Sequence, residues 1–310
     1  YQIGMSHGFR DENNDKINAL TKVVNDFQIS SLKDDALYQL ANTYTKTKNH
    51  KRAHEAYERL LDKHPKSSFI PRALVRQGLL YYIDNQNQEA IERFKLIANK
   101  FPNTPDAIEA VNNAKNIYLD EDNFDEYVAW VKKLKFINVS NSDVDNSTFT
   151  IAERKYFEGK NNYGIIFTLN KYLTKFPEGT HILKANYYLA DILFKEKQFD
   201  KAIVSYGEVL KAGTTQSSED ALAKLSQIYL EKQNFQEALP LLERLENEAY
   251  ITDNVQFAQS NLMKGYYETK AYKEAISYAK KVLSESNVKN TLEQDAITII
   301  ARAAFKNEDF

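Results

Sequence analysis

The chain contains no cysteine, which excludes disulfides, thiol catalysis and thiolate metal sites. Glycine and proline are scarce, with 9 and 6 among 310 residues, as expected of a mostly helical protein because both disfavour helix interiors. The net charge is only −2, with both signs mixed, which argues against a nucleic-acid-binding surface because such a surface requires a basic stripe. No apolar run approaches the roughly 18 residues of a membrane-spanning helix, and no secretory signal is visible.

The sequence also lacks the short motifs of common enzyme classes. It has neither a G-x-x-x-x-G-K-[ST] phosphate loop nor a G-x-S-x-G nucleophile motif. His50 and His54 have the i, i+4 spacing of two metal ligands, but no H-E-x-x-H motif includes them, so we expect a solvated surface pair. Residues 11–15 lack the glycine and glutamate of a calcium loop and are predicted to form an interhelical turn. The acidic run 120–126 is predicted to begin a helix, where acidic side chains complement the macrodipole. We expect no catalytic residues, no cofactor and no metal.

What the chain does have is a repeat of about 37 residues along its whole length. In the clearest copy, residues 34–44 (DDALYQLANTY) precede Ala53 and then His64-Pro65. In the next, residues 73–81 (ALVRQGLLY) precede Ala90 and then Phe101-Pro102. A fixed period in this range is typical of stacked-repeat proteins, whose chains lengthen without closing one round core.

Each of eight copies has an anchor position, usually alanine, in the second half of the repeat. The anchors are Lys16, Ala53, Ala90, Tyr127, Ile166, Ala202, Ala238 and Ala275. A large residue recurs nine positions earlier: Tyr44, Tyr81, Tyr118, Phe157, Leu193, Tyr229 and Tyr266. An aliphatic residue recurs seven positions later: Val23, Leu60, Ile97, Leu134, Leu173, Val209, Leu245 and Val282. Four copies carry a small residue twelve positions before the anchor: Ala41, Gly78, Ala190 and Ser226. Spacings of three, four and seven place such residues on one face of a helix, so each copy is predicted to be a helical hairpin that packs against its neighbours.

The register predicts one continuous array over residues 1–310. Its parts are a partial repeat at 1–32, repeats at about 33–69, 70–106, 107–145, 146–181, 182–217, 218–254 and 255–292, and a partial repeat at 293–310. Residues 138–147 have the composition of a linker, but the step between anchors across them is only 39 residues. We therefore predict a lengthened turn and a helix from about Ser147 to Gly159. Both ends align with the middle of a hairpin, so we expect the chain to be an excerpt of a longer repeat protein.

These positions resemble the tetratricopeptide repeat family. Its signature L-G-x2-Y, A-x3-F and P is matched by residues 40–44 (LANTY), by Ala53 with Tyr57, and by Pro65. Residues 77–81 (QGLLY), Ala90 with Phe94, and Pro102 also match, except that glutamine replaces the leucine. The resemblance implies an all-α solenoid of helix-turn-helix repeats in a right-handed superhelix, and a non-catalytic scaffold for protein–protein interaction.

In that family the first helices of the hairpins line a concave groove. Carried onto this chain, the groove positions implied by the resemblance are Tyr38, Asn42, Val75, Leu79, Tyr82, Asn112, Asn116, Tyr187, Asp191, Gln227, Lys264, Tyr267 and Arg302. Amides that bond a peptide backbone and rings that bury its side chains suit a partner protein or an extended peptide. Chaperone-binding members clamp a terminal carboxylate with lysines, an arginine and asparagines; Asn42 matches one asparagine, but Tyr38 stands where a lysine is expected.

A narrower likeness concerns residues 34–106. Their hairpin ends, His64-Pro65-Lys66-Ser67 and Phe101-Pro102-Asn103-Thr104, resemble those of bacterial envelope members, including the Tol-Pal-associated and outer-membrane-assembly lipoproteins. This likeness implies a component of a cell-envelope assembly or secretion machine, in the periplasm or at the outer membrane, and a cytoplasmic location stays open. Two other functions also stay open: a regulatory or substrate-recruiting module of an enzyme whose catalytic domain lies outside this segment, and a peptidoglycan-binding or other glycan-binding envelope protein.

Overall fold

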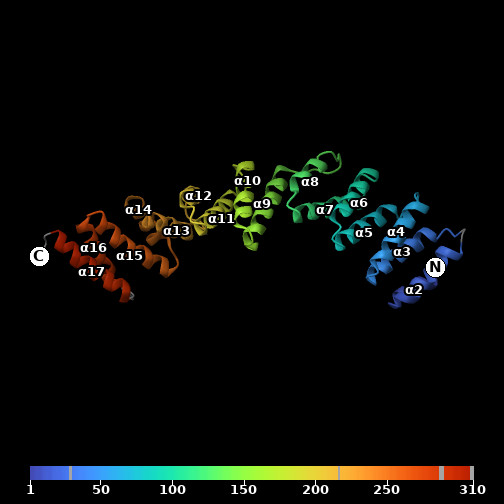
Figure 1. The fold of residues 1–310 in the computed structure, drawn as a ribbon, viewed down its shortest axis with the longest axis horizontal. Coiled ribbons are helices and arrows are strands. Elements are labelled where there is room, and N and C mark those ends of the chain that lie inside the picture. Colours follow the sequence, from blue (N-terminus) through green and yellow to red (C-terminus); the bar gives the residue numbers. More distant parts are fainter. Residues whose placement is uncertain (28–29, 216, 286–289, 308–310) are drawn as a thin grey trace. The chain divides into compact units, whose positions relative to one another are not determined.

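The computed structural model describes residues 1–27, 30–215, 217–285 and 290–307, and within these ranges it contains helices and no strand. The helices follow one another along the chain (Figure 1). Their bounds are α1 Gln2–Phe9, α2 Asn13–Asp26, α3 Lys33–Lys46, α4 His50–Lys63, α5 Ile70–Ile83, α6 Asn87–Lys100, α7 Pro105–Asp120, α8 Phe124–Val131, α9 Asn141–Glu158, α10 Asn162–Lys175, α11 Ile182–Lys195, α12 Phe199–Lys211, α13 Ser218–Glu231, α14 Phe235–Glu248, α15 Thr252–Glu268, α16 Tyr272–Leu283 and α17 Asn290–Lys306. The predicted all-α solenoid is confirmed.

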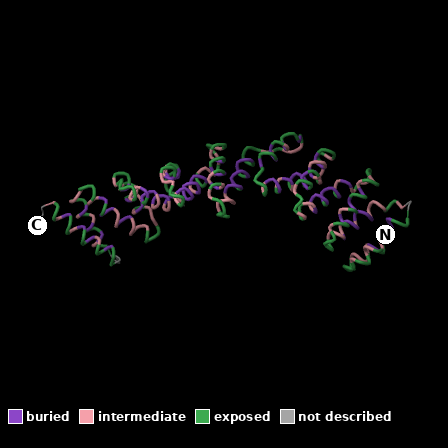
Figure 2. The backbone as a smooth tube through the Cα atoms, in the orientation of Figure 1, coloured by how far each residue is buried: buried purple, intermediate pink, exposed green. Residues whose placement is uncertain are grey.

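The chain forms two compact units, Tyr1–Ser147 and Thr148–Phe310. In the first unit each helix from α1 to α8 packs against the next, and in the second unit the same holds from α10 to α17. Odd-numbered helices are the first helices of the hairpins, and neighbouring first helices also pack together, as α5 does on α7 and α15 on α17. Buried residues lie on the helix sides that face other helices (Figure 2). Within the described ranges, none of the helices combines the length and hydrophobicity that a membrane crossing requires.

The helix pairs follow the predicted repeats closely but not everywhere. The pairs α3–α4, α5–α6, α11–α12 and α13–α14 lie inside the predicted repeat bounds. By contrast, α7, α9, α15 and α17 begin at residues 105, 141, 252 and 290, before the predicted repeat starts at about 107, 146, 255 and 293. The largest difference lies in the stretch that resembles a linker. There Ser140 and Asp143 form a reciprocal cap, in which each backbone N–H donates to the other side chain at 3.0 Å. This capping box starts α9 at Asn141, six residues before the predicted start at Ser147.

The predicted anchors lie at the buried crossing of the two helices, except for Lys16, which is only half-buried, and Ile166. Ala53, Ala90, Ala202, Ala238 and Ala275 are all 0% exposed. In the fifth hairpin the prediction of Ile166 is wrong, because Ile165 is the buried residue, 1% exposed, and Ile166 is only half-buried. Ile165 donates its backbone N–H to the carbonyl of the N-cap residue Asn161 at 2.9 Å, as Ala53 does to Asn49 at 3.0 Å.

The whole fifth repeat shifts with its anchor. Tyr156, nine residues before Ile165, is half-buried and stacks on Tyr188 with 4.1 Å between ring centroids, whereas the predicted Phe157 is 70% exposed. Tyr172, seven residues after Ile165, is fully buried, whereas the predicted Leu173 is only half-buried. Isoleucine stands at both 165 and 166, so the sequence pattern does not show which of them faces the core.

The turns inside the hairpins repeat one geometry. After α3, the N–H of Asn49 donates to the Tyr44 carbonyl at 2.8 Å and that of Lys48 to the Thr45 carbonyl at 3.0 Å, which is a Schellman motif. Lys48 lies in the left-handed region with φ of 58°. The same left-handed conformation is adopted in the other hairpin turns by Asp11, Asn85, Asp122, Lys197, Gln233 and Lys270. Only the α9–α10 turn has a glycine, Gly159, in this conformation. The residue that closes each motif also occupies the N-cap position of the next helix, and Asn49 and Asn234 cap it with their side chains, so the turn fixes how the two helices meet.

Placing glycine at one of these turns should stabilise the protein. A residue with a Cβ atom is disfavoured in the left-handed region by about 1 kcal/mol, a cost that glycine does not have. We expect Lys270→Gly to raise the free energy of urea unfolding by about 0.5–1 kcal/mol. The matched control is Lys280→Gly inside α16, which should lower that free energy by a similar amount. If Lys270→Gly destabilised as much as Lys280→Gly, the turn would not constrain the backbone as described.

The small residue of the first helix allows close approach of the second helix. A Cβ atom on Gly78 would lie 2.6 Å from the nearest ring atom of Phe94, and Phe94 is fully buried. The predicted role of this position is therefore confirmed at Gly78. By contrast, a Cβ atom on Gly207 of α12 would meet nothing within 4 Å.

These two glycines provide a paired test of the close contact. Gly78→Ala should lower the unfolding free energy by about 1–3 kcal/mol because the new methyl group overpacks the core. Adding Phe94→Leu should recover part of the loss produced by Gly78→Ala. Gly207→Ala should instead be neutral or stabilising by up to about 1 kcal/mol, since alanine favours helices. Equal effects of the two alanine substitutions in chemical denaturation would contradict the packing described.

Candidate partner-binding surface

All the predicted groove residues lie on first helices, as the register requires. Tyr38 and Asn42 are on α3, Leu79 and Tyr82 on α5, Asn112 and Asn116 on α7, Tyr187 and Asp191 on α11, Gln227 on α13, Lys264 and Tyr267 on α15, and Arg302 on α17. Their exposure differs widely. Tyr82, Asn112, Asn116, Gln227, Lys264 and Arg302 are exposed, and Asn42, Leu79, Tyr187 and Tyr267 are half-buried. Tyr38, Val75 and Asp191 are 7%, 1% and 2% exposed, so these three offer little surface to a partner.

In the first unit, three of the predicted groove residues, Tyr38, Asn42 and Tyr82, bond to or pack on the stack itself. Tyr38 stacks on Phe69 with 5.2 Å between ring centroids, and the side-chain oxygen of Asn42 accepts the Tyr57 hydroxyl at 2.8 Å. Tyr82 donates its hydroxyl to Asp120 of α7 at 2.6 Å. Because Asn42 already accepts the Tyr57 hydroxyl and Tyr38 is buried, these two residues do not form a clamp for a terminal carboxylate.

In the second unit, Asp191 is the buried centre of a polar network. Its carboxylate accepts the Tyr156 hydroxyl at 2.8 Å and pairs with Lys195 and Lys224, each at 2.6 Å. Lys224 also pairs with Asp220 at 2.8 Å, and Asp220 accepts the Tyr187 hydroxyl at 2.8 Å. The network joins the first helices α9, α11 and α13, so it fixes three neighbouring hairpins in one register.

Both central charges of this network are held in the ionised form. Burial would raise the pKa of Asp191, but hydrogen bonds from its two lysines and from Tyr156 outweigh that effect and lower it from the ordinary value of 3.8. Burial would lower the pKa of Lys224, but Asp191 and Asp220 outweigh that effect and raise it. Nearby, burial and the hydrogen bond to Glu153 raise the pKa of Tyr188 to about 12. At neutral pH the network is therefore an ion cluster edged by neutral tyrosines.

Removing the central carboxylate should be costly. Asp191→Ala leaves Lys224 with one acidic partner in a partly buried place, and we expect a loss of about 2–4 kcal/mol in unfolding free energy. Because the folded state lowers the pKa of Asp191, its contribution is complete above pH 3.8 and is lost as the pH falls through the folded-state pKa below that value. Urea unfolding at pH 7 and at pH 3 measures both effects, and the difference between wild type and variant should shrink at pH 3.

The matched control is Asp200→Ala. Asp200 is also paired with a lysine, Lys232, but 87% of its side chain is exposed, so screening by water should make its loss almost silent. An effect of Asp200→Ala as large as that of Asp191→Ala would show that burial does not decide the strength of these ion pairs.

Three of the predicted groove residues line a hollow in the second unit. Lys264, Tyr267 and Arg302 surround a cavity of about 370 Å³ together with Leu230, Phe235, Asn261, Glu268, Asp295, Thr298 and Ile299. Most of these residues come from α15 and α17, with Leu230 from α13 and Phe235 from α14. The lining therefore combines apolar side chains with charged, amide and hydroxyl groups in a volume typical of ligand sites.

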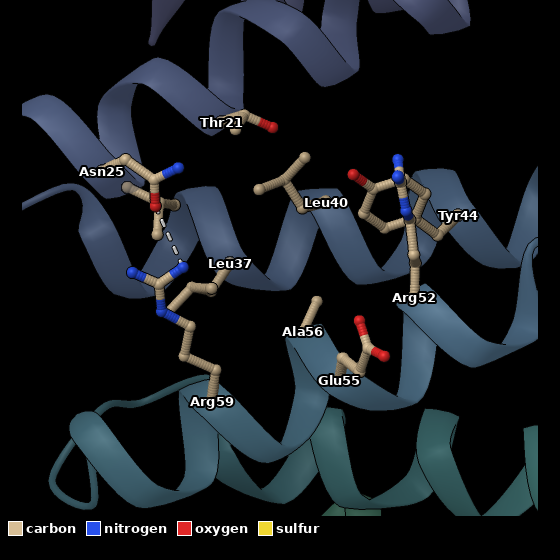
Figure 3. Close-up of a pocket in the computed structure, with 10 residues that line it drawn as sticks. Thr21, Asn25, Leu37, Leu40, Tyr44, Arg52, Glu55, Ala56 and Arg59 are labelled. Carbon is tan, nitrogen blue, oxygen red and sulfur yellow. Dashed lines mark hydrogen bonds between the residues drawn. The ribbon is translucent and has the colours of Figure 1, made fainter.

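A second hollow, of about 270 Å³, lies in the first unit. Figure 3 shows its lining from α2, α3 and α4, with apolar side chains such as Leu40 and Ala56 and the charged side chains of Arg52, Glu55 and Arg59. Arg59 donates to the side-chain oxygen of Asn25 at 3.1 Å. None of the predicted groove residues lines this hollow.

The histidine pair differs from its prediction. His50 and His54 are half-buried instead of solvated, and both contact Asp84 after α5, at 2.5 and 3.3 Å. His54 also packs on Tyr81 with 4.2 Å between ring centroids. The pair therefore joins two neighbouring hairpins.

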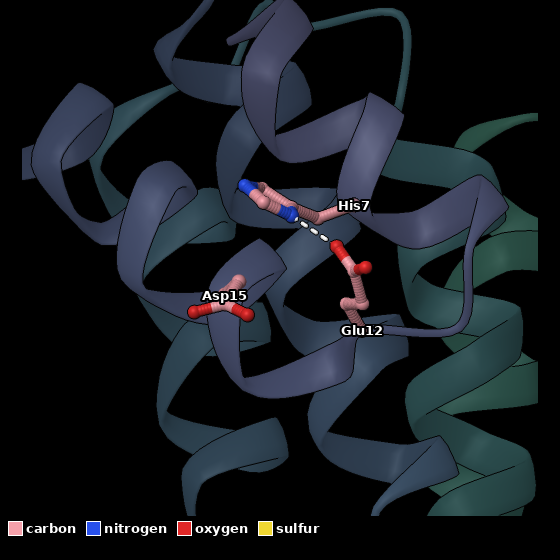
Figure 4. Close-up of side chains that lie close together, drawn as sticks. All are labelled: His7, Glu12 and Asp15. Carbon is pink, nitrogen blue, oxygen red and sulfur yellow. Dashed lines mark hydrogen bonds and ion pairs between the residues drawn. The ribbon is translucent and has the colours of Figure 1, made fainter.

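A different histidine belongs to a cluster that sequence patterns do not indicate. His7, Glu12 and Asp15 lie at the α1–α2 turn (Figure 4), and in the part of the chain that the structure describes they are the one His/acid group close enough to share a metal ion. His7 Nδ1 lies 2.5 Å from Glu12 Oε2. The Arg10 guanidinium lies 3.2 Å from the same carboxylate, so a positive charge is already supplied. Residues 10–12 form the interhelical turn, so the prediction of a turn over residues 11–15 is wrong for residues 13–15, which begin α2.

Several site residues escape the sequence pattern. Tyr156, Asp220 and Lys224 complete the network around Asp191, and Asn261, Glu268, Asp295 and Thr298 complete the larger hollow. One signal could have found the network: a tyrosine and an acidic residue separated by about one repeat, as in Tyr156 with Asp191 or Tyr187 with Asp220. No comparable spacing indicates the hollow.

Comparison with known proteins matches repeats in parts of the chain. Two family models, each described as tetratricopeptide repeat, match the chain, one over residues 35–67 and 72–104 and the other over residues 187–254. Among curated proteins no relative matches.

Similar solved structures come from several organisms. A tetratricopeptide repeat protein from Parabacteroides merdae is 12% identical over 86% of this chain and 98% of that one, with a TM-score of 0.33. The TPR2AB domain of yeast Sti1, solved in a complex with pHSP90, is 11% identical over 86% and 95%, with a TM-score of 0.39. Pseudomonas aeruginosa pilF is 17% identical over 79% and 88%, with a TM-score of 0.33.

Proposed function

We propose that this chain, which contains tetratricopeptide repeats, is a non-catalytic scaffold that binds a partner protein through an extended segment laid along its first helices. The observation that carries the proposal is the hollow over α15 and α17. It is the place where predicted groove residues meet an open cavity, whereas in the first unit Tyr38 and Asn42 already contact Phe69 and Tyr57.

The lining of this hollow suits a peptide. The Asn261 amide nitrogen donates to the Phe257 carbonyl at 2.8 Å, which leaves its side-chain oxygen able to accept a backbone N–H. The Tyr267 hydroxyl makes no hydrogen bond to any residue that the structure describes. Leu230 and Phe235, which are half-buried, offer an apolar surface, and the buried Ile299 also lines the hollow. A few placed polar groups around apolar side chains are what an extended segment needs for orientation and burial.

A glycan has less support as the ligand of the groove tyrosines. Sugar rings stack on open aromatic faces, but Tyr188 is stacked on Tyr156 at 4.1 Å and lies 6.0 Å from Tyr187. Tyr267 packs on Tyr272 at 5.6 Å. These tyrosine rings already pack on other rings of the stack, whereas the polar groups of the hollow are available to a peptide.

The proposal extends to a setting in a bacterial cell-envelope assembly, in the periplasm or at the outer membrane. Its support is the likeness of residues 34–106 to envelope members, carried by the hairpin ends at His64-Pro65 and Phe101-Pro102. Localisation of the full-length protein by fractionation of its source cells tests this part independently of the binding surface.

Selection from a random twelve-residue peptide library on the intact chain tests the binding function. We expect binders whose affinity falls at least about ten-fold in Thr298→Trp, because the indole fills the hollow without changing its charge. The control is Thr291→Trp, an exposed position on the same helix outside the hollow, which should leave affinity unchanged. A library without binders, or binders indifferent to Thr298→Trp, would rule out this surface.

A further inference from the structure

The charges around the larger hollow fall into two groups, one of which is already satisfied. Lys264 pairs with Asp295 at 3.1 Å, and Asp295 also accepts the Ser260 hydroxyl at 2.8 Å. These contacts outweigh the effect of burial and lower the pKa of Asp295. Lys264 and Asp295 thus neutralise each other across α15 and α17 and have little need of a ligand.

The second group is one cation and one anion without partners. Arg302 of α17 and Glu268 at the end of α15 both line the hollow and are exposed. Neither forms an ion pair or side-chain hydrogen bond with any residue in the described ranges. They also do not pair with each other, so a ligand that enters the hollow meets a free guanidinium and a free carboxylate.

The apolar part of the lining comes from the stack beneath these charges. Ile299 is 5% exposed, and Leu230 and Phe235 are half-buried, so the three side chains are held in place by the core. Arg302 follows Tyr267 by 35 residues, about one repeat, so the two occupy matching positions on neighbouring first helices. The apolar side chains and the two free charges share one cavity of about 370 Å³.

We propose that this hollow binds a peptide segment with mixed charge: an acidic side chain for Arg302, a basic side chain for Glu268, and an apolar side chain between them. The inference rests on the proposed peptide-binding function and names the class of segment bound. A segment with only acidic side chains would leave Glu268 facing like charge, and one with only basic side chains would do the same to Arg302. Complementary charges at an interface chiefly determine which partner is accepted and in which direction it lies.

The size of the hollow sets the length of the recognised segment. Three extended residues span at most about 10 Å, which suits a cavity of this volume. The predicted core motif is therefore a triplet such as Asp-Leu-Lys or its reverse within a longer strand.

Defined peptides test the charge pattern directly. Five triplets are placed between identical Gly-Ser flanks: Asp-Leu-Lys, Lys-Leu-Asp, Asp-Leu-Asp, Lys-Leu-Lys and Asn-Leu-Gln. Binding to the intact chain is measured by fluorescence anisotropy at low salt. We expect one mixed-charge order to bind at least about five-fold tighter than the like-charge and neutral triplets. Arg302→Ala should remove that preference, while Arg52→Ala, an exposed arginine in the other hollow, should keep it.

The double variant Arg302→Glu with Glu268→Arg gives the sharpest readout. Exchanging the two charges should reverse which mixed order binds more tightly, a result that a general loss of folding does not produce. Neutral triplets that bind as tightly as mixed ones, or an order that does not reverse, would overturn the inference. If the neutral triplet bound and Thr298→Trp abolished that binding, the scaffold function would stand although the mixed-charge inference failed. If no peptide bound, including peptides selected from the library, both the scaffold function and the mixed-charge inference would be rejected.

Discussion

Each hairpin of this chain depends on its neighbours for its core. The anchor residues at the helix crossings are completely buried at Ala53, Ala90 and Ala202, yet a hairpin has only two helices around them. In the second unit one hydrophobic cluster runs from Phe149 to Leu262 without closing on itself. Stability therefore comes from stacking, and a turn geometry repeated in every hairpin but one fixes how the two helices of a hairpin meet.

The same dependence explains where polar groups are found. Hydrogen bonds and ion pairs recur between residues one repeat apart, as in Tyr156 with Asp191, Tyr82 with Asp120 and Ser260 with Asp295. They join neighbouring first helices, so predicted groove residues such as Tyr82, Tyr187 and Asp191 are occupied by contacts within the stack. The hollow over α15 and α17 differs because Arg302 and Glu268 have no such partner among the residues that the structure describes. A surface suited to binding thus arises where the cross-repeat pairing is incomplete.

Much of this fold could be predicted from the sequence, because the repeat imposes the same packing at each copy. The helices, the buried alanines and the placement of groove positions on first helices all follow from spacing. The shift of the anchor from Ile166 to Ile165 could not be predicted, because the two adjacent isoleucines are equivalent in the sequence and differ only in burial. The start of α9 was missed although Ser140 and Asp143 carry a capping-box pattern. The free charges of the hollow, Glu268 and Arg302, come from α15 and α17 of neighbouring repeats, and no pattern within a single repeat indicates that they share one cavity.

The central claim is that a partner binds on the first-helix surface of the second unit. Amide hydrogen exchange of the intact chain, free and saturated with a selected peptide, tests it most directly, because exchange reports protection along every helix. The account predicts slower exchange in α13, α15 and α17, with α2 and α4 unchanged. Protection confined to α2, α3 and α4, around the hollow of Arg52 and Arg59, would contradict it.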